Sequence, residues 1–457
     1  MITGPLSPRR TGVCSMHATK QKSLSGFRHG LRSLRYRNYR LFFIGQGVSL
    51  IGTWMQSVAT GWLVFRMTHS EFMLGIVAFA GQIPILFISP FAGVLGDRVN
   101  RRYILIAVQA VAMAQAFTLA ALTFTGTVQV WQIALLAALL GITNAFEMPS
   151  RHAFVVEMID NKADLSNAIA LNSGIFNGSR LIGPTIAGFV VARAGEGVCF
   201  ALNGASYIAA MTAFILMSIK GRPEGREGKK FLSEIKDGFV YAFGFRPIRD
   251  LIATVALISL VAMSFPVILP IFAGSVLGGD SHTYGFLVAA TGAGALAGVT
   301  FLAMRKSVLG LGRVISAALV LFGATLAAFS FSRSVVLSTG ILVLTGFGMI
   351  TAMASCNTMV QTLVDEDKRG RVMSFYIMAV MGTAPLGSLL AGSVSSAIGA
   401  PATVLCGGVL CVFGGIVFAL RLPSLRRIVR PMYHRLGILP EDAAGIQAAD
   451  ELPGPPE

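Results

Sequence analysis

Twelve long apolar stretches run through this chain, and each is long enough to cross a lipid bilayer as a helix. A helical span needs about 20 apolar residues. The stretches lie at 41–65, 72–94, 103–124, 130–149, 167–192, 198–219, 250–272, 284–304, 313–332, 335–357, 372–398 and 402–420. Of the 457 residues, 54% are hydrophobic and only 13% are charged, which is more apolar surface than a soluble domain buries. We therefore expect an all-α polytopic membrane protein whose two termini lie on the same side.

Lysine and arginine gather in every second connection, and this pattern sets the expected orientation. An excess of these residues marks cytoplasmic loops. The expected inner segments hold 33 of the 37 basic residues, in 1–40, 95–102, 150–166, 220–249, 305–313, 368–371 and 421–435. Both termini are therefore predicted to be cytoplasmic. The net charge of +16 follows from the same bias, so no nucleic-acid partner is needed to explain it.

The longest polar interruption, 220–249, divides six spans from six. We expect a basic tail at 1–40, a six-helix bundle at 41–219, an amphipathic cytoplasmic linker at 220–249, a second bundle at 250–420 and a tail at 421–457. The first tail has no acidic residue and is expected to be disordered; translation could start at Met1 or at Met16. A shift of 204 residues aligns Gly178, Gly183, Ala187, Gly188, Val190 and Gly195 with Gly382, Gly387, Ala391, Gly392, Val394 and Gly399, as two related halves require.

A charged turn, Gly93 to Arg102, separates the second span from the third. Its sequence, Gly-Val-Leu-Gly-Asp-Arg-Val-Asn-Arg-Arg, must lie in water at a membrane face, and its glycines allow close helix approach. The run resembles the signature loop of the major facilitator superfamily, with Asn100 in place of the third glycine. The resemblance implies two six-helix bundles with a substrate site between them near the midplane. From their place at the inner face, we expect Gly93, Asp97, Arg98 and Arg101 to act in gating.

The first span carries five polar residues on one helical face. Gln46, Ser49, Thr53, Gln56 and Thr60 recur at i, i+3, i+7, i+10 and i+14. Because lipid cannot hydrogen-bond them, this face must meet protein or water. Contact between helices explains one or two such residues, whereas five in line favour a solvated substrate pathway.

The fifth span holds an arginine near mid-depth. Arg180 shares a face with Asn177, and a charge at this depth normally faces a wet cavity or a partner. We expect both residues to line the pathway, although Arg180 could instead hydrogen-bond backbone carbonyls.

A glycine-proline run follows Arg180 in the same span. Gly183 and Gly188 remove side-chain bulk, and Pro184 frees a carbonyl and bends the helix. The run resembles the Gly-Pro-x-x-Gly-Gly signature of exporters in the superfamily, with Ala187 in place of one glycine. The resemblance implies that the bend seals the outward end; a structural kink remains the alternative.

Glu147 is a carboxylate inside an expected span, four residues before Arg151. A partly desolvated carboxylate is suited to proton coupling. Alternatively, Asp97, Arg101, Glu147 and Arg151 form a charge network that latches the inner end, joined by the acidic run 365–367.

No motif indicates an enzyme or a cofactor. The chain has no hydrolase constellation, no phosphate-binding loop and no ligand spacing among its five cysteines, so we expect neither ATP nor a metal. The glycines at 292, 294 and 298 lie inside an apolar span, where they favour close helix packing.

Further stretches narrow the resemblance within the superfamily. They are Arg37–Phe43, Gly52–Gln56, Ala145–Arg151, Asn167–Asn172 and Phe200–Tyr207, and together they resemble the bacterial branch that contains the enterobactin exporter and the macrolide efflux pumps. The resemblance implies a monomer in the bacterial inner membrane that exports a small hydrophobic or amphiphilic molecule, such as a siderophore, macrolide or other metabolite, in exchange for protons. The alternatives are an importer or facilitator, and a non-transporting membrane scaffold.

Overall fold

A computed structural model describes residues 31–218, 244–305, 307–364 and 366–435. This part of the chain contains twelve helical spans and no strand. Eleven spans are the single helices α2 (Arg37–Thr68), α3 (Glu71–Arg98), α4 (Arg101–Phe124), α5 (Val130–Glu157), α6 (Lys162–Ala194), α7 (Glu196–Leu216), α11 (Ser281–Ala303), α12 (Leu311–Phe331), α13 (Val335–Leu363), α14 (Glu366–Ile398) and α15 (Ala400–Arg435). The remaining span is built from α9 (Arg246–Ala262), α10 (Phe265–Ile271) and the π-helical turn η2 (Phe272–Val276). Pro266 and Pro270 remove backbone donors there, which explains why this span is broken.

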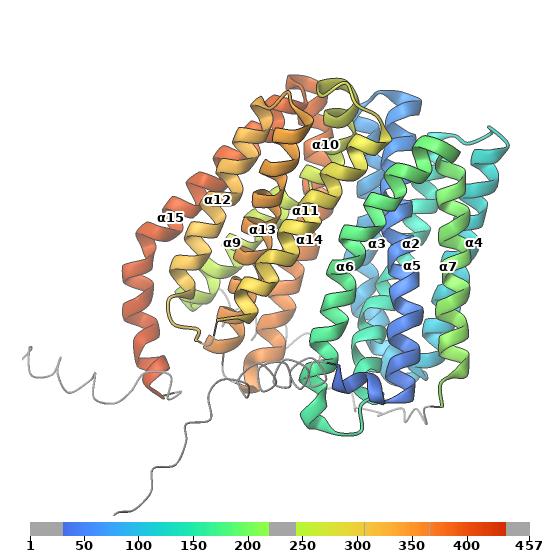
Figure 1. Cartoon of the computed structure of the whole chain (residues 1–457). Coiled ribbons are helices and arrows are strands. Elements are labelled where there is room, and N and C mark those ends of the chain that lie inside the picture. Colours follow the sequence, from blue (N-terminus) through green and yellow to red (C-terminus); the bar gives the residue numbers. More distant parts are fainter. Residues whose placement is uncertain (1–30, 219–243, 306, 365, 436–457) are drawn as a thin grey trace, which may run out of the picture.

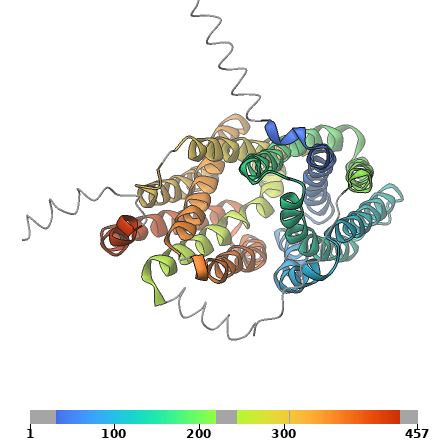
Figure 2. The same cartoon turned by 90° about the horizontal axis from the view of Figure 1, so that it is seen from below.

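The helices form two bundles, as the sequence predicts. Helices α2–α7 make one bundle and α9–α15 the other, and they lie side by side in Figures 1 and 2. Both described ends of the chain lie at the lower end of Figure 1, where the short 3₁₀ helix η1 (Arg32–Arg35) precedes α2 and where α15 stops. We call this the lower end of the molecule, and the opposite end, where α10 lies, the upper end.

Several helices extend past the apolar stretches that predict them, and α15 does so furthest. Helix α2 starts at Arg37, and α15 continues to Arg435 although its apolar stretch stops at 420. A helix does not have to stop where the membrane does, since its backbone hydrogen bonds are satisfied internally in either medium. The predicted amphipathic linker helix falls mostly on 219–243, outside the described residues.

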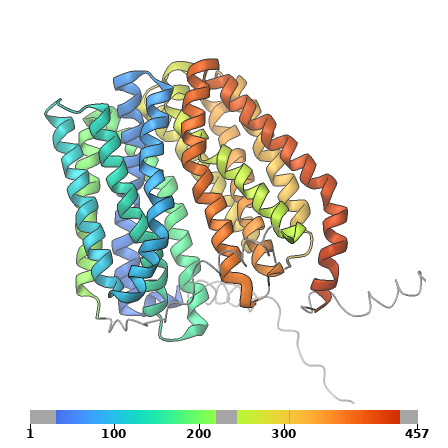
Figure 3. The ribbon, with the colours of Figure 1, turned by 180° about the vertical axis from the view of Figure 1, so that it is seen from behind.

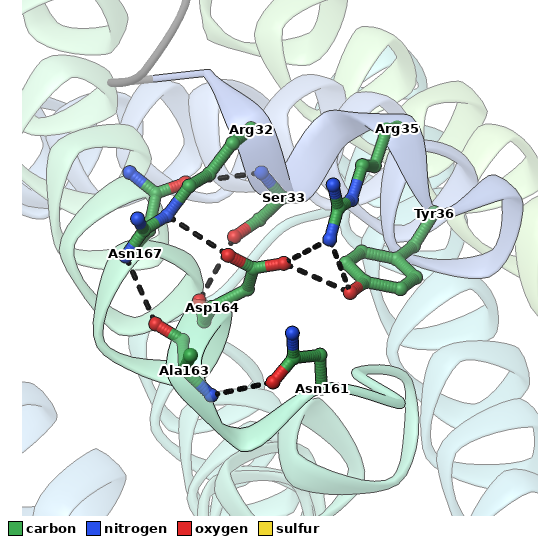
Figure 4. Close-up of polar contacts among 8 residues, drawn as sticks. All are labelled: Arg32, Ser33, Arg35, Tyr36, Asn161, Ala163, Asp164 and Asn167. Atoms are coloured by element: carbon green, nitrogen blue, oxygen red, sulfur yellow. Dashed lines mark hydrogen bonds and ion pairs between the residues drawn. The ribbon is translucent and has the colours of Figure 1, made fainter.

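The last part of the first tail is structured, which corrects the expectation of disorder for 31–40. Figure 4 shows η1 fastened to the start of α6 through Asp164, whose side chain is 6% exposed. The carboxylate pairs with Arg32 at 3.0 Å and Arg35 at 2.5 Å, and it accepts a hydrogen bond from the Tyr36 hydroxyl at 2.9 Å. Ser33 adds a hydrogen bond from its hydroxyl to the Asp164 carbonyl at 3.0 Å. The basic residues that read as a loose tail therefore bind one buried carboxylate.

The bundles meet at the upper end through two glycine crossings. Gly188 of α6 lies against Gly285 of α11, where a Cβ at Gly285 would be 2.9 Å from the Gly188 Cα. Gly392 of α14 lies against Gly75 of α3, where a Cβ at Gly392 would be 2.9 Å from the Gly75 Cα. Only glycine allows backbones this close. Gly188 and Gly392 are 204 residues apart, the offset of the internal repeat, so the two crossings are equivalent.

Small residues also pack the second bundle internally. Gly294 and Gly298 of α11 contact α13, which confirms the packing role predicted for this glycine run. Cys199, Cys356 and Cys411 are buried and unbridged, as apolar fillers would be.

Candidate functional site

A cavity of about 340 Å³ lies between the two bundles in the upper half of the molecule. Its walls come from α2, α3, α4 and α5 on one side and from α10 and α11 on the other. The polar lining residues are Thr53, Gln56, Ser57, Thr60, Gln82, Gln115, Asn144 and Tyr284, and the rest are apolar or glycine. The cavity therefore offers amides and hydroxyls, and no charged side chain, within an apolar wall.

An amide network fixes the polar wall of this cavity. The Gln56 side-chain amide donates to the Gln115 carbonyl oxygen of α4 at 3.0 Å, and the Asn203 amide of α7 donates to Gln56 at 2.7 Å. The Thr53 and Tyr207 hydroxyls lie 3.4 Å apart beside it. Because these groups satisfy one another, the network holds α2, α4 and α7 in register.

Two contacts between the bundles involve residues that line the cavity. Trp62 of α2 stacks on Tyr284 of α11, with ring centroids 6.2 Å apart and planes inclined by 21°. On the other side, the Gln82 amide of α3 donates to the Ser388 hydroxyl of α14 at 3.1 Å. Besides the two glycine crossings, the bundles are therefore joined by an aromatic contact and a hydrogen bond beside the cavity.

This architecture agrees with comparisons to known proteins. Residues 29–434 match the model of a family described as transmembrane secretion effectors, within the major facilitator superfamily. The chain belongs to this family of membrane transporters.

Its curated relatives include transporters from several bacteria. The transporter is 27% identical to the staphyloferrin A transporter of Staphylococcus aureus, over 83% of this chain and 95% of that one. It is 24% identical to the multidrug efflux pump Tap of Mycolicibacterium fortuitum, over 82% and 93%. A shorter match, 26% identical over 34% of this chain and 38% of that one, is to the macrolide efflux protein A of Streptococcus pyogenes.

Solved structures share the fold at low sequence identity. A transporter of the POT family, PepTSo, superposes with a TM-score of 0.67 at 14% identity, covering 86% of this chain and 99% of that one. A bacterial homologue of the lysosomal transporter Spinster, in an inward-facing occupied conformation, gives 0.66 at 14% identity, covering 84% and 96%.

The polar stripe of α2 has two different surroundings in the transporter. Thr53, Gln56 and Thr60 line the cavity. Gln46 and Ser49 are only 2% and 3% exposed and do not line it. The periodicity identified one face of the helix. The lower part of that face is buried against protein, and its upper part lines the cavity.

Cysteine labelling tests this division of the stripe. In a variant free of native cysteines, we expect Thr53→Cys and Thr60→Cys to react with a water-soluble thiol reagent. Ser49→Cys should stay unreactive, like the control Leu50→Cys, because residue 50 is also buried, at 8% exposure. Equal reaction rates at 49 and 60 would show that the whole stripe is solvated.

Several lining residues escaped sequence analysis. Ser57 and Tyr284 stand outside the stripe, and Gln82, Gln115 and Asn144 are isolated polar residues in apolar spans. Each isolated amide was itself a signal, since a polar group in a span needs a partner or water. Only the fold shows that they converge on one volume.

Arg180 and Asn177 of α6 lie outside the cavity lining. Arg180 is a partly exposed residue, and its guanidinium sits over the Trp54 ring of α2, with 5.6 Å between Cζ and the ring centroid. Within the described part of the chain it makes no ion pair or hydrogen bond. Asn177 is buried, and its amide donates to the Ser173 carbonyl at 2.9 Å. The structure thus places Asn177 in a local contact and leaves the Arg180 charge without an acidic partner in that region.

The glycine-proline run of α6 serves both sides of this helix. A Cβ at Gly183 would lie 2.6 Å from the Trp54 Cβ, so this glycine packs α6 on α2 within its own bundle. The Pro184 carbonyl and Gly188 face Gly285 of the other bundle. Pro184 lies inside a continuous helix.

Two ion pairs are described among the residues of the expected charge network at the lower end. Glu147 pairs with Arg151 at 3.5 Å within α5, and both side chains are largely buried. Arg101 pairs with Glu157, a residue that the sequence did not single out. Gly93, Asp97 and Arg98 belong to α3, and residues 366–367 begin α14. The contacts of these residues, and residue 365 itself, lie outside what the structure describes.

The described residues contain no group of three His, Cys, Asp or Glu side chains arranged to hold a metal. The chemistry available at the cavity is hydrogen bonding by amides and hydroxyls together with apolar contact, which suits reversible binding of a small amphiphilic molecule.

Proposed function

We propose that the transporter exports a small amphiphilic molecule from the bacterial cytoplasm by alternating access. In this proposal the lower end is cytoplasmic, the upper end faces outward, and the protein works as a monomer in the inner membrane. The observation that carries the proposal is the cavity between the bundles, beneath an upper end closed by equivalent crossings from both halves. Rocking of the bundles about such a site is how two-bundle transporters expose it to each side in turn.

The cavity lining favours a cargo with a large apolar part and several hydrogen-bonding groups. Its polar residues are amides and hydroxyls, and its apolar wall includes Val64, Leu74 and Leu119. Relatives named for multidrug and macrolide transport support such a cargo class, and the relative named for staphyloferrin A adds siderophores as a second candidate class. We propose that Arg180 adds a contact for an anionic or polar group of the cargo as it enters from the lower end.

Proton exchange is the proposed energy source. Glu147 is the candidate coupling group, because it is a largely buried carboxylate well inside α5. Its neighbour Arg151 lies 3.5 Å away on the same helix, so a change of this ion pair can accompany the movement of the bundles. Asp97, Arg98 and Arg101 are proposed to regulate the change between the two open states.

Transport in liposomes tests the direction and the coupling together. Purified protein of known orientation is reconstituted with a macrolide or a carboxylate siderophore, and a pH gradient of either sign is imposed. We expect cargo to move from the lower face to the upper face only when protons flow from the upper face to the lower face. Movement of cargo down its own gradient, without any effect of the pH gradient, would indicate a facilitator. Movement of cargo and protons in the same direction would indicate an importer. Absence of flux for every cargo would indicate a scaffold.

If Arg180 contacts the cargo, its substitution should weaken the binding of anionic cargo and leave neutral cargo unaffected. Arg180→Lys keeps the charge but loses the planar fork, and Arg180→Leu loses both. Because a hydrogen bond to a charged group contributes about 1.5–3 kcal/mol, we expect the half-saturating concentration of an anionic cargo to rise about tenfold or more in both variants. A neutral cargo should be unaffected.

The matched control is Arg193→Leu, which removes an exposed arginine near the upper end of the same helix. Equal losses for anionic and neutral cargo in Arg180→Leu would exclude a direct cargo contact. Failure of this variant to accumulate in the membrane would indicate the structural role instead.

A further inference from the structure

A second cavity, of about 300 Å³, lies at the lower end of the other bundle, far from the cargo cavity in the chain and in the fold. It is bounded by the connection into α12, by Met359 of α13 and by the last turns of α15. We call it the α15 groove. Its lining residues are Leu309, Gly310, Leu311, Gly312, Met359, Leu422, Leu425, Arg426, Arg427, Val429, Arg430 and Tyr433.

The α15 groove has an apolar floor and a basic rim. Leu422, Leu425, Val429 and Tyr433 follow one face of α15 at i, i+3, i+7 and i+11, and all are buried. The rim consists of Arg426, Arg427 and Arg430, which are exposed. Arg426 and Arg430 are one helical turn apart, so their guanidiniums can reach one anionic group together.

The rim charges have no protein partner in the part of the chain that the structure describes. Nearby, Arg421 of the same helix is paired with Asp250 of α9 at 3.2 Å. For Arg426, Arg427 and Arg430, by contrast, no ion pair or hydrogen bond with a described residue exists. Three arginines thus surround an apolar groove with their charges available to a ligand.

The length of α15 places this rim at the membrane interface. The helix has 36 residues, which at a rise of 1.5 Å per residue is about 54 Å, whereas the hydrocarbon core is about 30 Å thick. With Ala400 at the upper boundary, the core is crossed after about 20 residues, near Leu420. We infer from this length that the arginines between 421 and 430 lie at the level of the lipid headgroups. Figures 1 and 3 show that α15 continues to the lower end of the molecule.

We propose that the α15 groove binds an anionic phospholipid. The lipid phosphate lies between the rim arginines, and an acyl chain lies along the buried apolar face of α15 against α12. A ligand with one anionic head and an apolar tail, present at this depth, fits both halves of the groove. The proposal is independent of the cargo and of the direction of transport.

Lipid retention by the full-length protein tests the proposal. Protein in detergent is mixed with phosphatidylglycerol or with phosphatidylcholine of the same acyl chains, and native mass spectrometry measures the bound fraction. We expect clear preference for phosphatidylglycerol, and Arg426→Gln/Arg430→Gln should weaken its binding about tenfold or more. Leu309→Trp, which fills the groove but keeps the rim charges, should also weaken it.

The matched control is Arg37→Gln/Arg40→Gln, which removes two exposed arginines at the same end of the first bundle. If this control loses as much phosphatidylglycerol as the α15 variant, general surface charge binds the lipid and the proposal is wrong. It is also wrong if protein ending at 435 binds this lipid and the full chain does not, because the acidic segment 436–457 would then be the occupant. Retained preference in both the α15 variant and Leu309→Trp would place the lipid elsewhere.

Discussion

Gly392→Leu is expected to prevent closure of the upper end and so to reduce transport strongly. A Cβ at this position would lie 2.7 Å from the Glu71 carbonyl oxygen and 2.9 Å from the Gly75 Cα, both of them backbone atoms that cannot rotate away. Overpacking of a tight contact costs about 1–3 kcal/mol, which lowers the population of the closed state about 5- to 150-fold. The equivalent change Gly188→Leu should act in the same way at the other crossing.

Two measurements check this expectation. Transport is followed in liposomes, and a cysteine at Thr60 reports how readily an impermeant thiol reagent enters the cavity from the upper side. We expect slower transport and faster labelling. The control Gly340→Leu adds the same side chain to α13 at a place with no atom within 4 Å and should behave as wild type. Slow transport without faster labelling would separate these glycines from upper-end closure.

Glu147→Gln is expected to abolish proton-driven transport while leaving cargo exchange intact. The substitution keeps the shape and some hydrogen-bonding capacity but cannot change protonation. If Glu147 carries the coupling proton, accumulation driven by a pH gradient should fall to the level of protein-free liposomes. Exchange of labelled for unlabelled cargo needs no net proton movement and should continue.

The companion variant Glu157→Gln distinguishes coupling from a structural charge pair. Glu157 is a carboxylate on the same helix that also pairs with an arginine, but it lies at the end of α5. We expect this variant to retain gradient-driven transport. If both variants lose coupling and exchange alike, charge pairs at the lower end serve gating, and the proton site must be sought elsewhere.

Most of the fold follows from the sequence because the membrane leaves a chain few options. Each apolar stretch had to become a helix, since lipid satisfies no backbone hydrogen bond. Glycines at a repeat of 204 residues predicted two related halves, and Gly188 and Gly392 occupy equivalent crossings. The structured segment from Arg32 to Tyr36 was missed because its arginines match a tail in composition, and only the folded chain brings Asp164 to them.

The site was less predictable because helix periodicity shows which residues share one face of a helix but not what packs against that face. The stripe from Gln46 to Thr60 is one face of α2, yet its lower part is buried and only its upper part meets the cavity. Gln82 and Gln115 reach the same volume from two other helices, a convergence that depends on packing. Charge pairs were predicted from proximity along the chain, which found the Glu147–Arg151 pair but not the Arg101–Glu157 pair, whose members are 56 residues apart.

The fastening of η1 has a consequence for how the chain is assembled. Ser33 and Asp164, which hold each other at the lower end, are 131 residues apart. During synthesis, Arg32 and Arg35 are made first, and their partner Asp164 is made only after the first four spans. The contact can therefore form only late, after α6, the fifth span, has packed into the first bundle.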